Sequence, residues 1–421
     1  MKSFKSLRKH PLINLLITSK GNPKALLLME PLWGIPFQLL APFVTLYMVM
    51  QGISDVQIGL LLSISMVGQM FFSFFGGIIT DKLGRRMATV IAEAIGWSLA
   101  SFVWAISSNF WMFLLAYAVN WVWRIGGSSW DCLLVEDADP NEMLGIYTWI
   151  HIGGLVAVFF APIAGFLIEQ FTLVPVVRGL YVFFGVGVAI KVILTYTCCT
   201  ETKQGKIRQR ETKSLSTRTM VQEYRSVIPQ ILRSPATLKI VAINALLQIT
   251  MMVSTTFFGL YVTTELGVPE RFLAFFPILN AVVMLIFMFV IQHKIAYIKD
   301  KIPLWVGLII FAACHVLLIL IPAGNMILIL VHLLFVAVAN ALVGPRTGAM
   351  LQLALDPKER ARIMAIVMSF TIAFTAPFGF LAGLLSEIDR RLPFVLTTVL
   401  FVIAMVVVSR IRDDEFKAGA H

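Results

Sequence analysis

The sequence predicts an all-α membrane protein with twelve transmembrane helices in two six-helix halves. Three observations predict this fold class: long segments without charge, one long polar segment in mid-chain, and short motifs that recur in both halves. Of the 421 residues, 58% are hydrophobic and 14% are charged, whereas soluble domains carry about 25% charged residues. Because a bilayer core needs roughly 20 apolar residues per helix, this composition favours a chain that crosses a membrane many times.

Charge-free segments define the individual spans. The segments Val56 to Thr80 and Ile363 to Ser386 contain no charged residue. The segment Ile302 to Pro345 is about twice as long, and a Pro-Ala-Gly-Asn turn signal at 322–325 divides it into two spans. The predicted spans are 24–50, 55–80, 86–107, 110–135, 142–169, 172–199, 236–264, 270–292, 302–321, 325–354, 358–385 and 391–411.

The distribution of basic residues predicts the orientation of the chain. With a cytoplasmic N-terminus, Lys and Arg gather in the segments between spans that lie inside the cell and are scarce outside. We therefore expect both termini in the cytoplasm and the protein in the cell membrane. The net charge of +11 reflects this topology, and charges spread over loops do not indicate nucleic-acid binding. Within span six, Arg178 and Lys191 lie near opposite ends, so both are expected to snorkel toward an interface.

The polar segment 201–235 separates the two predicted halves. Tyr47 and Tyr261, and likewise the proline pairs of spans five and eleven, recur in the same order at a nearly constant offset. Such self-similarity indicates an internal duplication, a frequent architecture of transporters. The predicted domains are a basic cytoplasmic tail (1–23), an N-terminal six-helix half (24–200), a cytoplasmic central loop (201–235), a C-terminal six-helix half (236–411) and a second cytoplasmic tail (412–421).

A dense ionic turn follows span two. A glycine one turn before the end of the span allows a neighbouring helix to approach closely, and a second glycine permits a turn that a β-carbon would strain. The acidic residue between them carries the charge that a helix N-terminus favours. The residues concerned are Gly77, Asp81, Lys82, Gly84, Arg85 and Arg86.

With this turn, the six-plus-six spans and the basic central loop, the chain resembles the major facilitator superfamily. The signature of that family between spans two and three is G-x-x-x-D-[RK]-x-G-[RK]-[RK], and the resemblance covers about residues 24 to 411. It implies a secondary transporter that works by alternating access. It also implies that Asp81 faces the start of span eleven, near Pro357, and latches the cytoplasmic side, with the arginines pairing with Asp81 or with the acidic turn at 136–142.

Two observations qualify the latch. A solvated, positive-inside turn is the alternative interpretation, and it accounts for Lys82, Arg85 and Arg86 but not for Asp81 with two glycines. The equivalent turn of the second half, in the segment 291–303, lacks both glycines. We therefore expect a latch on one half only.

Span four carries polar residues on one helical face. Asn120, Arg124, Gly127 and Asp131 follow one another at steps of four, three and four residues. Because charges inside a membrane are costly and usually face a cavity, we expect this face to line the central cavity. The resemblance gives Arg124 the position of an arginine linked to proton coupling in exporters; structural pairing with a carboxylate is the alternative. Asp131 belongs either to the proton path or to the mouth of the cavity.

Other spans carry further candidate residues. Glu30 is the only acid of span one, and the resemblance implies a membrane-embedded acid of multidrug exporters there, although Glu30 is also close enough to an interface to reach it. Milder polar stripes occur on spans seven and ten, which line the cavity in the superfamily. The residues of these stripes are Asn244, Gln248 and Thr255 on span seven, and Asn340, Gly344, Arg346 and Thr347 on span ten.

Span five carries a partial match to an exporter motif, G-P-x-x-G-G. Ala161, Pro162 and Gly165 match it in outline, with alanines at 161 and 164 in place of two glycines. Small residues beside a proline suit a bend and close packing against another helix. Ordinary helix packing would require the same residues, so the motif favours export without establishing it.

The remaining function classes are not favoured. The sequence contains no nucleotide-binding P-loop and no H-E-x-x-H zinc motif, and His151, His315 and His332 occur singly on separate spans. We expect no enzymatic activity, no cofactor and no metal. The predicted function is proton-coupled efflux of lipophilic or amphipathic small molecules by a monomer, with the substrate, H⁺ and membrane lipids as partners and no nucleic acid. A proton-coupled importer of a small polar metabolite, or a non-transporting receptor or enzyme, is the alternative.

Overall fold

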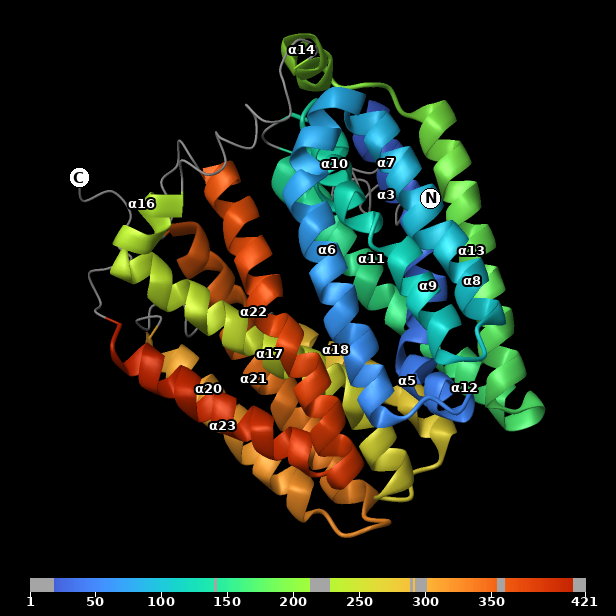
Figure 1. Ribbon diagram of the computed structural model, residues 1–421, viewed down its shortest axis with the longest axis vertical. Coiled ribbons are helices and arrows are strands. Elements are labelled where there is room, and N and C mark those ends of the chain that lie inside the picture. Colours follow the sequence, from blue (N-terminus) through green and yellow to red (C-terminus); the bar gives the residue numbers. More distant parts are fainter. Residues whose placement is uncertain are drawn as a thin grey trace, which may run out of the picture. The chain divides into compact units, whose positions relative to one another are not determined.

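The computed structural model describes residues 19–139, 142–212, 228–287, 291, 301–353 and 360–411. Helices make up nearly all of this part of the chain, as Figure 1 shows. Ten of them are long and apolar enough to cross a membrane. Their ranges are Gly21–Met50, Asp55–Leu83, Arg85–Ile106, Ile146–Phe171, Leu173–Cys198, Thr237–Thr264, Lys301–Leu320, Met326–Gly344, Ile366–Ile388 and Leu392–Ser409.

Two of the twelve predicted spans are absent from these ten. The fourth consists of α9 (Phe110–Asn120) and α10 (Trp123–Val135), with residues 121–122 between them. The eighth begins as a 3₁₀ helix, η3 (Glu270–Phe275), and continues as α18 (Phe276–Ile286). The predicted all-helical fold is confirmed, and the count of twelve is supported for ten spans.

The chain divides into two compact units. The first contains Met1–Ala41 and Phe71–Met220, and the second contains Pro42–Met70 and Val221–His421. The boundary between residues 220 and 221 lies inside the predicted central loop. The segment 42–70, which ends span one and begins span two, groups with the second unit, whereas we assigned it to the N-terminal half.

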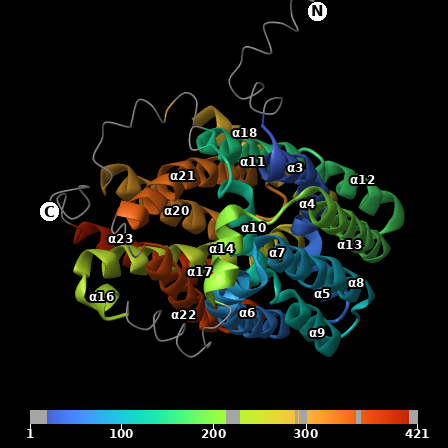
Figure 2. The same cartoon turned by 90° about the horizontal axis from the view of Figure 1, so that it is seen from above.

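The first unit is built around α13, which packs on α3, α4, α7 and α8; Figures 1 and 2 show these helices side by side. A second contact joins α10 to α7. The elements are α3 (Gly21–Met29), α4 (Pro31–Leu40), the end of α6 (Asp55–Leu83), α7 (Arg85–Glu93), the π-helix η2 (Ala94–Leu99), α8 (Ala100–Ile106), α9, α10, α11 (Met143–Val158), α12 (Ala161–Phe171), α13 (Leu173–Cys198) and α14 (Lys203–Thr212).

Prolines explain the broken helices of span one. Pro31 occupies the first turn of α4, Pro36 lies inside that helix, and Pro42 lies in the 3₁₀ segment η1 (Ala41–Phe43) that follows. Because proline has no amide N–H and its ring clashes with the preceding turn, each residue weakens the continuous helix that the hydropathy predicts. The first break falls at Glu30, between α3 and α4.

The second unit is built around α20, which packs on α21 and α23, while α17 packs on α21, α22 and α23. Figure 2 shows α20 between α21 and α23. The elements are η1, α5 (Val44–Met50), the start of α6, α16 (Ile228–Arg233), α17 (Pro235–Thr264), η3, α18, α20 (Lys301–Leu320), α21 (Met326–Leu353), α22 (Arg360–Ile388) and α23 (Leu392–Ser409).

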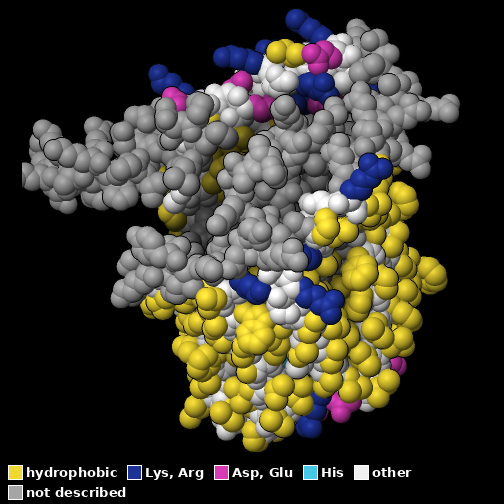
Figure 3. Space-filling model, turned by 90° about the vertical axis from the view of Figure 1, so that its left-hand side faces the viewer, with side chains coloured by type: hydrophobic (Ala, Val, Ile, Leu, Met, Phe, Trp, Pro, Cys, Tyr) yellow, Lys and Arg dark blue, Asp and Glu magenta, His cyan; other side chains and the backbone are white. Residues whose placement is uncertain are grey.

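The described outer surface is apolar, as a lipid environment requires. Large hydrophobic side chains are exposed along α20 and α23, including Val306, Ile309, Val399 and Val402. Figure 3 shows hydrophobic side chains over most of the described part of one face, with charged side chains at its margins. This arrangement identifies an integral membrane protein.

Candidate functional site

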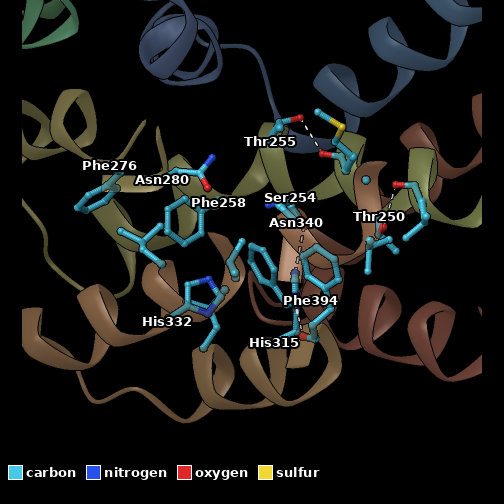
Figure 4. A pocket seen from close by; sticks show the side chains of 18 of the residues that line it. Thr250, Ser254, Thr255, Phe258, Phe276, Asn280, His315, His332, Asn340 and Phe394 are labelled. Atoms are coloured by element: carbon cyan, nitrogen blue, oxygen red, sulfur yellow. Dashed lines mark hydrogen bonds between the residues drawn. The ribbon is translucent and has the colours of Figure 1, made fainter. Parts of the chain in front are cut away.

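A cavity of about 510 Å³ lies within the second unit, between α17, α18, α20, α21 and α23. Figure 4 shows its side chains. Aromatic residues such as Phe258, Phe276 and Phe394 form much of the wall, and polar side chains interrupt them. The polar residues are Asn244, Gln248, Thr250, Ser254, Thr255, Asn280, His315, His332, Asn340 and Thr347.

Both polar stripes that the sequence indicated reach this cavity. Span seven contributes Asn244, Gln248 and Thr255 to the wall, and span ten contributes Asn340, Gly344 and Thr347. Arg346 does not line this cavity: it is buried, and its Nη1 donates to the backbone oxygen of Leu342 at 3.2 Å.

Two histidines that the sequence analysis treated as isolated lie together in the cavity wall. The ring centroids of His315 and His332 are 5.9 Å apart. The Nδ1 atoms lie 2.9 Å from the carbonyl oxygens of Phe311 and Cys314, respectively. Because a carbonyl only accepts, both Nδ1 atoms carry hydrogen. The Ser254 hydroxyl then donates to Nε2 of His315 at 3.1 Å.

The expectation that these two histidines stand alone is therefore wrong. Spans nine and ten are antiparallel neighbours, so residues 17 positions apart come together, which residue spacing within one helix does not reveal. The side chain of His151 lies outside the described part. No group of three or more His, Cys, Asp and Glu residues in the described part is placed to hold a metal ion.

The cavity contains hydrogen-bond acceptors that the protein does not satisfy. Oδ1 of Asn280 is buried and has no partner among the described residues. Nε2 of His332 is an acceptor in the tautomer deduced above, and the Phe258 ring stacks on this histidine at 5.6 Å. Unpaired acceptors in an apolar wall favour a ligand with N–H or O–H donors.

The ionic turn after span two forms a network within the first unit. Arg85 Nη1 donates to Asp81 Oδ1 at 2.7 Å, and Arg85 Nε donates to Glu136 Oε1 at 3.1 Å. The predicted pairing of the arginines with Asp81 and the acidic 4–5 turn is thus observed for Arg85. Lys82 is exposed. The start of span eleven near Pro357, the expected partner of Asp81, lies outside the described residues.

The central loop contributes residues to this network that the sequence did not predict. Arg208 of α14 donates through Nη2 to Asp81 Oδ2 at 2.8 Å, and this hydrogen bond raises the pKa of Arg208. The Glu201 carboxylate accepts from the backbone N–H groups of Arg85 and Arg86 at 2.9 and 3.1 Å. An anion therefore caps α7 where Gly84, with φ +86°, begins the helix.

The Asp81→Asn substitution is expected to release α14 from the turn. It removes the charge shared by Arg85 and Arg208 but keeps the size of the side chain. Hydrogen bonds to charged groups are worth about 1.5–3 kcal/mol each when buried, and less here because Arg208 is partly exposed. Limited trypsin digestion should cut α14 about tenfold faster in the variant, which corresponds to about 1.4 kcal/mol. Equal cleavage in Asp81→Asn and a Lys82→Gln control would contradict this prediction.

Span four does not present one continuous polar face. The helix is interrupted at residues 121–122, so Asn120 ends α9 whereas Arg124, Gly127 and Asp131 lie on α10. Asn120 is buried and its amide donates to the carbonyl of Gly96. The Arg124 guanidinium lies 4.2 Å from the Trp123 ring centroid, and Asp131 is exposed. The role of this face in a cavity stays a prediction.

The span-five motif lies at a helix boundary. Helix α11 ends at Val158 and α12 begins at Ala161, with Pro162 in its first turn. Ala161, Ala164 and Gly165 are buried. The motif therefore combines a break with close packing, as both of its interpretations require.

A buried group of three charged residues joins spans one, three and six in the first unit. The Lys191 ammonium donates to Glu30 Oε2 at 3.2 Å and to Glu93 Oε1 at 2.9 Å. Lys191 is 2% exposed, so the expectation that it snorkels to an interface is wrong. Two carboxylates stabilise the ammonium inside the unit instead. The sequence contained a signal for this contact, since Glu30, Glu93 and Lys191 each interrupt an otherwise apolar part of their spans.

Two helical units, a cavity of a size that suits a small molecule and buried ionisable groups are together typical of a membrane transporter. The sequence profile of the Major Facilitator Superfamily matches residues 32–370. The chain belongs to this family.

The similar proteins include transporters of several kinds. An uncharacterized MFS-type transporter of Bacillus subtilis, YqjV, is 30% identical over 33% of this chain and 36% of its own length. The multidrug resistance protein MdtG of Erwinia billingiae is 27% identical over 34% of this chain and 36% of its own length. The quinolone resistance protein NorA of Staphylococcus aureus is 28% identical over 25% of this chain and 26% of its own length. The matched region thus spans at most about a third of these relatives.

Solved structures share the fold. The nucleoside transporter NupG superposes with a TM-score of 0.70 at 13% identity, covering 92% of this chain and 99% of that one. The human organic anion transporter MFSD10 superposes with a TM-score of 0.63 at 14% identity, covering 95% of this chain and 100% of that one. At such identities the likeness concerns the fold, and the transported molecules of these proteins differ from one another.

Proposed function

We propose that this transporter exports lipophilic or amphipathic small molecules in exchange for protons, and that the cavity of the second unit holds the substrate. The observation that carries the proposal is the wall of this cavity, which is mostly aromatic and aliphatic with a few polar groups. A volume of about 510 Å³ suits a drug-sized molecule. The names of MdtG and NorA, which refer to drug resistance, support export.

The unpaired acceptors narrow the chemical class of the proposed substrate. Asn280 Oδ1 and His332 Nε2 would accept hydrogen bonds from an amine or hydroxyl group, while Phe258 and Phe276 would contact an apolar body. An amphipathic molecule with at least one N–H or O–H donor combines both properties. A strictly apolar molecule would leave these acceptors unpaired.

We also propose the remaining roles that the sequence indicates. The chain acts in the cell membrane as a monomer with both termini cytoplasmic, and the Asp81 turn is its cytoplasmic gate. Arg124, Asp131 and Glu30 are the proton-coupling candidates of the first half. Increased inward-open population in Asp81→Asn, measured between spin labels on the cytoplasmic loops, would support the gate; unchanged populations would remove it.

The Phe258→Ala substitution is expected to weaken transport by reducing the apolar wall of the cavity. Loss of a large aromatic contact costs about 3–5 kcal/mol in a packed core, and less at a partly open wall. We expect at least a tenfold rise in the substrate concentration for half-maximal transport, measured with a panel of fluorescent amphipathic amines in inverted vesicles. Phe335→Ala is the matched control, because Phe335 lies on α21 and is 45% exposed on the outer surface. Equal effects of both substitutions would exclude the cavity as the substrate site.

Import of a small polar metabolite is the second candidate. The presence of Asn244, Asn280 and Asn340 in the wall favours it, and the neighbour NupG is a nucleoside transporter. Two measurements separate the candidates: drug susceptibility of cells with and without the protein, and the direction of substrate movement in vesicles with an imposed pH gradient. Increased resistance on expression supports export, whereas uptake of a polar metabolite without a change in resistance supports import.

A further inference from the structure

The group formed by Glu30, Glu93 and Lys191, called the triad below, contains one more acid than base. The side chains of Lys191 and Glu93 are 3% and 9% exposed. With both carboxyl groups ionised, the triad would carry a net negative charge in a buried position. An uncompensated buried charge is far more costly than a neutral set of the same groups. The arrangement therefore favours one bound proton.

Hydrogen bonding within the triad also favours one bound proton. Lys191 Nζ reaches one oxygen of each carboxyl group. The other oxygen of Glu93, Oε2, is buried and has no hydrogen-bond partner among the described residues. A charged oxygen without a donor is costly inside a protein, so this unpaired position also favours one bound proton in the triad. The Glu30 side chain is 19% exposed, which makes it the member of the triad most accessible from outside.

Within the described part of the chain, the ion pairs of Glu30 and Glu93 are those with Lys191. Helices α3, α4, α7, α10 and α11 and the segment η2 pack around this part of α13 or on one another. The Trp130 ring of α10 faces Lys191 Nζ at 5.6 Å, and the Cys199 thiol lies within electrostatic range of Glu93. Glu30 and Lys191 interact electrostatically with each other and with Glu93.

The remaining basic groups on these elements have other contacts. Arg85 pairs with Asp81 and Glu136, the Arg86 guanidinium lies over the Tyr196 ring, and Arg124 lies over Trp123. The other charged or titratable residues of the packed elements are Lys24 on α3, Asp131 and Cys132 on α10, and Tyr147 on α11.

We propose that the triad is the proton-binding site of this transporter and holds one proton, shared between its two carboxyl groups. Binding adds H⁺ to a carboxylate oxygen and changes the net charge of the triad from minus one to zero. Release to water reverses the step. The two carboxyl groups act as one titrating unit, because both face the same ammonium. The role of this proton in transport rests on the proposed function, whereas the bound proton itself does not.

Infrared difference spectroscopy on the purified full-length protein tests the bound proton without any substrate. The spectrum near neutral pH should contain the C=O band of a protonated carboxylic acid, which disappears at high pH. Glu93→Gln and Glu30→Gln should each lose this band, because one ammonium and one carboxylate then balance. Glu169→Gln, which changes an exposed acid of α12, should keep it. A wild-type band that survives both substitutions, or no band at all, would overturn the proposal.

Transport in sealed vesicles tests the use of the proton. Glu93→Gln is expected to lose the acceleration by a pH gradient of the movement of a fluorescent amphipathic amine. Glu169→Gln should keep this acceleration. A wild type that moves no amine refutes the proposed function and leaves the infrared result to decide the proton site. A Glu93→Gln variant that is still driven by the gradient shows that the triad is not the coupling site.

Discussion

Replacing Lys191 by alanine is expected to destabilise the first unit by about 3–5 kcal/mol, because it removes one partner of a buried ion pair and leaves the others in place. Glu30 and Glu93 would then face one another without a cation. With one proton already bound to the pair, the second carboxyl group would have to bind another proton or keep an uncompensated charge inside the protein. The measurement is the unfolding midpoint of the purified protein in detergent, together with the amount of protein inserted in the membrane.

A rescue variant distinguishes the loss of the positive charge of Lys191 from the loss of its packing contacts. Adding Glu93→Gln to Lys191→Ala removes one of the two acids, so the double variant should be more stable than Lys191→Ala alone. If the substitutions only removed packing, the losses of stability caused by Lys191→Ala and by Glu93→Gln would add in the double variant. Arg178→Ala is the control on the same helix, since Arg178 lies near the other end of α13 and is partly exposed. A Lys191→Ala variant as stable as Arg178→Ala would show that the ammonium contributes little.

The triad also shows what a sequence can and cannot predict in this protein. Hydropathy predicts the spans because apolar length is a property of each segment alone. It does not predict that Lys191 faces Glu30 and Glu93, because this contact depends on how three helices rotate about their axes. The same limit explains the histidines: His315 and His332 are isolated in the sequence, yet they share one cavity wall.

Helix breaks mark a second limit. The spacing of Asn120, Arg124 and Asp131 predicts one face only if span four is a continuous helix, but residues 121–122 interrupt it. Neither of these two residues is a proline, so the sequence does not predict the interruption. By contrast, the prolines of span one coincide with the breaks that the structure contains. The polar stripes of spans seven and ten lie on α17 and α21, which are continuous over them, so their residue spacing is kept in the structure.

A seam of small residues joins α6 to α22 in the second unit. Gly59 and Ser63 on α6 face Gly379 and Gly383 on α22, with each pair four residues apart. The Ser63 hydroxyl donates to the carbonyl of Ala376, and the N–H of Phe380 donates back to Ser63 at 2.7 Å. Small residues at this spacing let helix backbones approach closely.

Charged contacts close one end of the seam. The Ser386 hydroxyl donates to Oδ2 of Asp55, and Arg390 Nη1 lies 3.3 Å from the same oxygen. Asp55 is buried, so its charge depends on these partners. The seam joins spans two and eleven, which belong to different halves of the predicted duplication. Transporters with alternating access separate their halves on one side of the membrane at a time, and a seam of this kind is where such a separation would begin.

Replacing Gly59 by leucine is therefore expected to prevent closure of the seam. A β-carbon at position 59 would lie 2.9 Å from the α-carbon of Gly383 and closer still to the carbonyl oxygen of Gly379. Both are backbone atoms, which cannot rotate away as a side chain can.

Overpacking costs about 1–3 kcal/mol where the structure cannot relax, so the closed seam should lose about tenfold or more in population. The distance between spin labels on the sides of α6 and α22 that face away from the seam measures this closure, and transport should fall with it. Gly179→Leu is the control, since a β-carbon at that helical glycine meets no atom within 4 Å. Equal label distances in Gly59→Leu and Gly179→Leu would mean that the seam accommodates the side chain and is not a close contact between the two helices.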